Sequence, residues 1–348
     1  MEDDSGYNAS SVEHPLFYYD DGNIILSCED DDTLFRVHRS ILAKRCPVLS
    51  NLITNLGHGD RKPQITVGCI HLPLSDTKED LEALLKIIYH DIRVDSLTLV
   101  SDDLALLSSI YRMAAKYQLE DTVTDVYTLI RRKWPSDHTA HMQRRTFEKA
   151  HHHRPLPRIV GLPGHAALIH PASGAPTPPT VFIHPAHIIT LLRQGGCADP
   201  EILAPLFYAL SCAPPDERAL SALRPTDFAR YARGLERLRS VHARHAAVCP
   251  TAESLGLAGD HVHLCWPGLR LLWADLGGAA LESGEVPVFA AAREPVELWG
   301  VVAVSLADPA GFAGQYCVCA ECLRRVAVRM RQISVALWTQ VPWMFGLK

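Results

Sequence analysis

The residues with the clearest chemical potential in this 348-residue chain are three closely spaced cysteines near its C-terminus: Cys317, Cys319 and Cys322. Thiolates at two- and three-residue spacing near a helix start can converge on one zinc ion, and a tetrahedral structural site needs a fourth ligand. On a long predicted helix, His242 and His245 share a face and Cys249 lies one turn further. These three positions span about 10 Å of helix axis, so they cannot all reach one ion.

Buried or half-buried thiols and histidines are the alternative to a metal site, because the sequence has no second C-x-x-C pair. The ten cysteines are expected to be reduced, since nothing in the N-terminal residues is typical of a secreted protein. We therefore predict no bound cofactor. A zinc-containing regulatory protein remains an alternative, with five candidate ligands: Cys317, Cys319, Cys322, His242 and His245.

Catalysis is not indicated by any motif in the sequence. His38 and Arg39 are an adjacent pair that resembles a catalytic dyad, but an enzyme also needs an activated nucleophile or a metal with a base. Patterns such as G-x-S-x-G, H-E-x-x-H, the P-loop and G-x-G-x-x-G are absent. The sequence therefore predicts a non-enzymatic protein with no catalytic residue.

The charge of the chain predicts neither nucleic-acid nor membrane partners. Its net charge is −5 and its pI about 6.4, and ten of the first 32 residues are acidic with no Lys or Arg among them. Phosphate binding calls for basic surface, and a bilayer span calls for about 18 to 20 apolar residues, which no run approaches. We expect a cytoplasmic or nuclear protein.

Residues 23–53 contain the elements around which the chain is organised. Asn23 to Cys28 is a strand-like run, an acidic turn follows, and Leu34 to Val37 forms a second short strand. After His38 the apolar residues recur at helical spacing, and Pro47 stands where it can open a second helix. A strand-like run over 65–72 and three amphipathic helices follow, so residues 15–133 are expected to form an α+β domain.

This order of elements, with Phe35-Arg36-Val37-His38-Arg39-Ser40-Ile41-Leu42 at its centre, resembles the BTB/POZ domain over residues 15–133. Phe35, His38, Arg39, Leu42 and Ala43 fit the family's pattern. Three positions depart from it: Asn23 replaces an aspartate, Cys46 a serine and Leu49 a phenylalanine. The resemblance implies a small sheet capped by helices and a role in binding other proteins.

The resemblance also implies a homodimer in which apolar residues of the first helix pack against a twin. The interaction residues that we predict on this basis are Phe35, His38, Arg39, Ile41, Leu42 and Leu49. The alternative is that the same side chains belong only to the intramolecular core. Some BTB proteins are substrate adaptors of cullin-type ubiquitin ligases and use an apolar-x-Glu turn, but the corresponding loop, residues 55–60, has no glutamate. A cullin scaffold therefore stays an alternative partner.

The remaining chain divides by composition. We predict a flexible acidic tail at 1–14, the BTB/POZ domain at 15–133, a His- and Pro-rich linker at 134–180 and a mainly helical domain at 181–348. Nine of the 18 histidines lie between His138 and His187, and eight of the 24 prolines lie between Pro155 and Pro185.

In the predicted C-terminal domain, long helices are expected around 226–245 and 321–339, a Gly- and Pro-rich stretch lies at 255–297, and residues 301–306 fit either strand or helix.

The last 30 residues resemble the C-terminal part of fungal BTB proteins with an uncharacterised helical region. The residues that carry this resemblance are Cys319, Cys322, Trp338, Pro342, Phe345, Gly346 and Leu347. That resemblance implies no biochemical activity.

Overall fold

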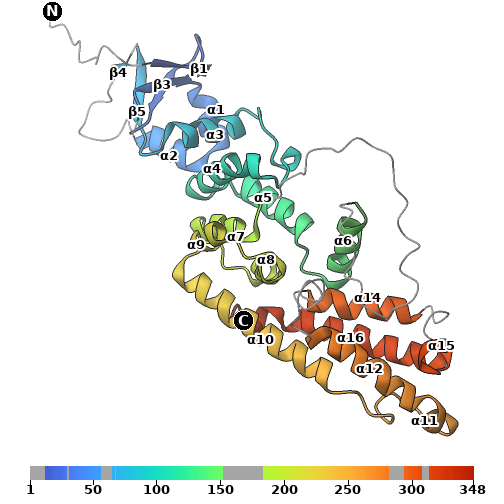
Figure 1. Cartoon of the computed structure of the whole chain (residues 1–348). Helices are drawn as coiled ribbons and strands as arrows, with labels where there is room; N and C mark the ends of the chain where they lie inside the picture. Colours follow the sequence, from blue (N-terminus) through green and yellow to red (C-terminus); the bar gives the residue numbers. More distant parts are fainter. Residues whose placement is uncertain are drawn as a thin grey trace, which may run out of the picture. The chain divides into compact units, whose positions relative to one another are not determined.

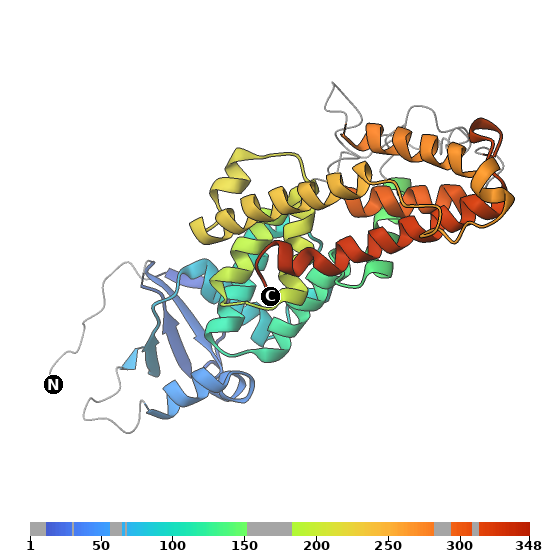
Figure 2. The ribbon, with the colours of Figure 1, turned by 90° about the horizontal axis from the view of Figure 1, so that it is seen from below.

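The computed structural model describes residues 12–29, 31–55, 65–66, 68–151, 183–281, 294–307 and 313–348. The chain forms two compact units (Figures 1 and 2). The first comprises Met1–Ile130, Val181–Ile183 and Leu191–Cys197. The second comprises Arg131–Thr180, His184–Thr190 and Ala198–Lys348. Among the described residues, no helix combines the length and the apolar character that a membrane crossing requires.

A five-stranded mixed sheet forms one side of the first unit, in the order β1-β3-β2-β5-β4. Its strands are β1 (Val12–Tyr18), β2 (Ile24–Ser27), β3 (Thr33–Val37), β4 (Ile65–Thr66) and β5 (Cys69–Pro73). The β2–β3 and β4–β5 pairs are antiparallel, whereas β1–β3 and β2–β5 are parallel. Strands β1 and β4 are therefore the two edges.

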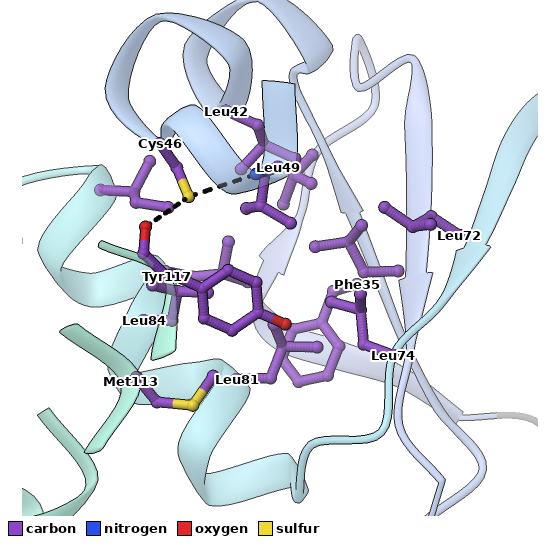
Figure 3. Close-up of a cluster of buried hydrophobic side chains, with 14 of the residues drawn as sticks. Phe35, Leu42, Cys46, Leu49, Leu72, Leu74, Leu81, Leu84, Met113 and Tyr117 are labelled. Carbon is purple, nitrogen blue, oxygen red and sulfur yellow. Dashed lines mark hydrogen bonds between the residues drawn. The ribbon is translucent and has the colours of Figure 1, made fainter. Parts of the chain in front are cut away.

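Five α-helices accompany the sheet: α1 (Arg39–Arg45), α2 (Pro47–Asn55), α3 (Lys78–Ile88), α4 (Leu104–Lys116) and α5 (Glu120–Lys133). Side chains alternate across a strand, so Ile24 and Leu26 of β2 share a face with Phe35 and Val37 of β3. These residues join leucines of α1, α2 and α3 in one buried cluster (Figure 3). Ile25 and Leu34 point to the other face and form a much smaller cluster.

The predicted α+β fold is confirmed, and two local details differ from the sequence-based expectation. The run at 65–72 is a hairpin of two strands, because Gly68 adopts a φ of +72° and turns the chain. Strand β1 begins at Val12, inside the predicted tail, since the buried side chains of His14 and Phe17 tie this segment to the sheet.

The second unit is helical, and its long helices α10, α12, α14 and α16 pack along one another (Figures 1 and 2). Its α-helices are α6 (His138–His151), α8 (Pro200–Cys212), α9 (Glu217–Ser221), α10 (Pro225–Ala247), α11 (Asp260–Leu264), α12 (Trp266–Leu281), α14 (Pro295–Ala307), α15 (Ala313–Tyr316) and α16 (Ala320–Met344). Helix α7 (Pro185–Gln194) has residues in both units.

Several helices of the second unit extend beyond their predicted limits. Pro225 is the first residue of α10, where its missing N–H costs no hydrogen bond, so α10 starts one residue before the predicted 226. The predicted Gly- and Pro-rich stretch 255–297 contains α11 and α12, and residues 301–306 belong to α14. Helix α6 falls within the predicted linker, and residues 152–180 of that linker lie outside the described residues. The exact domain limits stay a prediction.

A buried carboxylate, Glu297 on α14, connects four helices of the second unit. His141 Nε2 of α6 lies 2.8 Å from its Oε1, Arg145 Nε lies 3.3 Å from the same oxygen, and the Tyr208 hydroxyl of α8 donates to its Oε2. The His141 ring stacks on Trp338 of α16 at 4.1 Å between centroids. Burial by itself would raise the pKa of the Glu297 carboxyl, but the His141 hydrogen bond and the Arg145 charge lower it to about 2.

We expect Glu297→Gln to lower the free energy of unfolding by about 3 to 5 kcal/mol at neutral pH, because it removes one partner of a buried charged pair. The folded pKa is lower than that of the unfolded chain, so this contribution is complete above the ordinary pKa of 4.5 and is lost as pH falls toward 2. The difference between wild type and variant should therefore shrink at about pH 3.

Tryptophan fluorescence during urea unfolding measures this effect, since all six tryptophans fall in the ranges of the second unit. Glu236→Gln, an exposed change on α10, is the matched control and should change the free energy of unfolding by less than about 0.5 kcal/mol. An equal loss for Glu297→Gln at both pH values would contradict the assignment of a buried ionised carboxylate.

Candidate functional site

Three of the six predicted interaction residues form the core of the first unit. Phe35, Leu42 and Leu49 are each fully buried, and Figure 3 shows them directed into one cluster. Their side chains therefore have no surface to offer a second polypeptide while the domain is folded. The structure thus places them in the intramolecular core, the alternative that the sequence left open.

His38 joins the start of α1 to the end of α3. Its backbone N–H donates to the Tyr89 hydroxyl at 2.9 Å, and its ring Nδ1 lies 2.9 Å from the same oxygen. Its Nε2 lies 3.1 Å from the Asp21 carboxylate. The remaining two predicted residues are on α1, where Arg39 is exposed and Ile41 is half-buried against the core.

The three departures from the BTB pattern preserve the local hydrogen bonds or packing. Asn23 Oδ1 accepts the Arg39 N–H at 2.8 Å, as an aspartate oxygen would. Cys46 Sγ accepts the Leu49 N–H at 3.4 Å, so the thiol caps the start of α2 in place of a serine hydroxyl (Figure 3). Leu49 fills the aromatic position with a fully buried side chain. Burial raises the pKa of the Cys46 thiol, which keeps it uncharged.

Exposed apolar side chains gather on the edge strand β1. Val12 and Leu16 are each 61% exposed, and Pro15 between them is exposed as well. The pairing with β3 is irregular between Glu13 and Tyr18, so this part of β1 bulges away from a regular ladder. We call these three residues, Val12, Pro15 and Leu16, the β1 face.

His14 holds the bulge of β1 together. Its ring is buried and stacks on Phe35 with 4.5 Å between centroids, and its Nδ1 accepts the N–H groups of Leu16 and Phe17 at 3.2 Å each. Its Nε2 lies 3.5 Å from Glu82. Burial lowers the pKa of His14, which favours the neutral ring that these two hydrogen bonds require. The β1 face is thus presented by a fixed backbone.

In the second unit, two of the predicted metal ligands meet two residues that the sequence analysis did not single out. Cys319 and Cys322 lie beside His261 and Cys265, and the four possible ligand atoms are all within 4.8 Å of one another. His261 Nδ1 is 3.4 Å from Cys322 Sγ, 3.6 Å from Cys319 Sγ and 3.7 Å from Cys265 Sγ. We call this group the Cys3His cluster.

Local helix geometry aligns each half of the Cys3His cluster. Cys319 is the N-cap of α16 and Cys322 lies three residues later, in the first turn of the same helix. The nearby backbone N–H of Cys322 lowers the pKa of the Cys319 thiol to about 7. His261 and Cys265 are four residues apart, one turn along α11 and its C-cap. The H-x3-C spacing of His261 and Cys265, in the same chain as a C-x-x-C pair, is the sequence signal that could have revealed these two ligands.

The other predicted ligands lie away from the Cys3His cluster. Cys317 is exposed and has a φ of +54°. His242 accepts a hydrogen bond from Trp299 Nε1 at 3.2 Å, and burial lowers its pKa to about 4. His245 lines a shallow cleft with Arg244 and Arg329. These three residues form no ligand set with Cys319 and Cys322.

The first unit is thus an α+β module with a helical cap and an apolar edge strand. Residues 20–133 match the family model of the BTB/POZ domain, and this part of the chain is a BTB/POZ domain. BTB/POZ domains bind other proteins, so the domain is a protein-interaction module. The match ends at residue 133, so most of the second unit lies outside it. Comparison with curated proteins and with solved structures found no match.

We expect His38 and Tyr89 to act as one unit that stabilises the start of α1. Tyr89→Phe leaves the His38 N–H without its acceptor and should cost about 1 to 3 kcal/mol of local stability. A double-mutant cycle with His38→Ala should give a coupling energy of about 0.5 to 3 kcal/mol. Hydrogen exchange of α1 measures both values. Arg39→Ala, which removes an exposed side chain beside the pair, is the control, and strictly additive effects of the two changes would contradict the coupling.

Proposed function

We propose that this protein is a non-enzymatic interaction protein whose BTB/POZ domain forms a homodimer through the β1 face. The observation that carries the proposal is the position of Val12 and Leu16: two exposed apolar side chains on β1, the edge strand that pairs with β3 of the protein-interaction domain. Exposed apolar edge strands favour association with another chain, and proteins usually cover them. Strand β1 of a second copy of the chain is equally apolar and could bury these side chains.

A two-fold axis beside β1 brings the two copies of this strand together in antiparallel orientation, so Leu16 of one chain can approach the β1 face of its twin. The Leu16 and Phe17 N–H groups already donate to His14, and therefore a continuous backbone ladder cannot form there. We expect contact through side chains. Ile41, half-buried on α1, is the member of the predicted interaction set that retains apolar surface.

Light scattering coupled to size-exclusion chromatography tests the proposal on the full chain. We expect a mass of twice 38.5 kDa for the wild type and a monomer for Leu16→Glu, because the charge would be buried at the contact. Ile65→Glu is the matched control. Ile65 is 68% exposed on β4, the opposite edge of the same sheet, and its replacement should leave the dimer intact.

A wild-type monomer at high micromolar concentration would contradict homodimerisation. If that monomer were retained by a cullin N-terminal region, the adaptor alternative would replace our proposal. A dimer that persists in Leu16→Glu and dissociates in Ile65→Glu would move the contact to the other edge of the sheet and overturn the assignment to the β1 face.

A further inference from the structure

We propose that the second unit binds one zinc ion in a closed structural site made by four residues: His261, Cys265, Cys319 and Cys322. The site fastens α11 and the beginning of α12 to the start of α16. It lies within one unit of the chain, and it does not depend on the proposed dimer.

The distances from His261 Nδ1 to the three sulfurs of the Cys3His cluster are those of ligands around a common ion. Zinc–sulfur bonds of about 2.3 Å and zinc–nitrogen bonds of about 2.0 Å at tetrahedral angles place nitrogen and sulfur about 3.5 Å apart. The three distances from His261 Nδ1 to the sulfurs are 3.4, 3.6 and 3.7 Å. One ion at the centre of the four atoms can therefore contact all of them with little movement.

Hydrogen bonding alone does not account for this arrangement. A neutral imidazole nitrogen that accepts has a single lone pair, so three thiols around Nδ1 of His261 would have to share that lone pair in long, divided hydrogen bonds. Three sulfurs nevertheless surround it, and those of Cys265 and Cys322 belong to buried residues. A cation that replaces the thiol protons gives each of the four atoms one strong bond, which explains why they converge.

The donor set selects the kind of metal and its role. Three thiolates with one imidazole are a ligand set of structural zinc sites, whereas calcium and magnesium prefer oxygen. Four protein ligands fill the tetrahedral positions and leave none for water or substrate. The site is therefore suited to holding elements together and not to catalysis.

Helix α11 needs such a fastening because its packing gives it little support. It has only five residues, none of them is buried, and its N-cap, Gly259, provides no side-chain hydrogen bond. Leu264 within it is 70% exposed. Short helices are unstable without tertiary contacts. Bonds from His261 and Cys265 to an ion shared with α16 would supply them.

Gly268 allows the two halves of the cluster to approach each other. A Cβ atom at this position of α12 would lie 1.9 Å from the carbonyl oxygen of Tyr316 and 2.8 Å from a methyl group of Val318. The absence of a side chain thus lets the segment before Cys319 pack directly on the helix that follows Cys265. Cys317 in this segment has a left-handed backbone, which non-glycine residues rarely adopt without a compensating constraint.

Metal analysis of the full chain, produced without a polyhistidine tag in zinc-supplemented medium, tests the proposal. A wash with a weak chelator removes ions that the three successive histidines at 151–153 could bind weakly. We expect about one zinc per chain in the wild type and less than about one-tenth in Cys322→Ser. Cys317→Ser is the matched control, because it removes a neighbouring cysteine outside the cluster and should retain about one equivalent.

Two further measurements keep the proposal testable if Cys322→Ser fails to fold. His261→Ala removes an exposed side chain, so it should fold and still lose the zinc. Cobalt(II) exchanged into the wild type should give the visible absorption of a tetrahedral thiolate complex. Wild-type protein with under about one-tenth of an equivalent of zinc, equal zinc loss in Cys317→Ser, or a Cys319–Cys322 disulfide in freshly isolated protein would each overturn the proposal.

Discussion

The packing of one face of the β2–β3–β5 sheet against α1, α2 and α3 is the constraint on which the first unit depends. Because side chains alternate along each strand, burying Phe35 and Val37 under the helices fixes the register of β3 and the direction in which α1 leaves it. The helices then occupy that face of the sheet. At one edge of the sheet, outside this packed face, β1 presents its exposed apolar side chains.

Individual hydrogen bonds preserve the fold of the first unit where the sequence departs from the family pattern. The Asn23 amide and the Cys46 thiol each accept a backbone N–H at the start of a helix, so neither replacement leaves that N–H unpaired. His38 likewise works through the Tyr89 hydroxyl. Residues that carry the family resemblance are thus mostly structural in this chain, and the surface that we assign to association lies on β1 instead.

The sequence predicted the elements of the first unit well because their signals are local. Short apolar and β-branched runs beside turn residues in β2 and β3, and helical spacing in α3 and α4, need no knowledge of the rest of the chain. Strand β1 was missed because its buried residues, His14 and Phe17, are three apart across a bulge, so the alternation is lost. Residues 12–18 form a strand because they pair with β3, a contact that local sequence does not reveal.

The sequence predicted two of the four residues of the Cys3His cluster, and the other two were missed for a different reason. Cys319 and Cys322 are adjacent in sequence, but the turn of α11 that completes the set lies more than fifty residues earlier, in a stretch whose glycines and prolines obscure helical spacing. The predicted ligand His242 instead pairs with Trp299, a contact that tertiary packing creates. Glu297 was missed similarly, because its partners come from α6 and α8.

Disulfide cross-linking at β1 tests the central claim, that this edge is where two chains meet, most directly. In a Cys317→Ser background, which removes the exposed native thiol, a cysteine in place of Leu16 should form a covalent dimer under mild oxidation, since a two-fold axis beside β1 brings the two copies close. A cysteine in place of Ile65 on the opposite edge should not. Cross-linking at Ile65 but not at Leu16, or at neither position, would contradict the account.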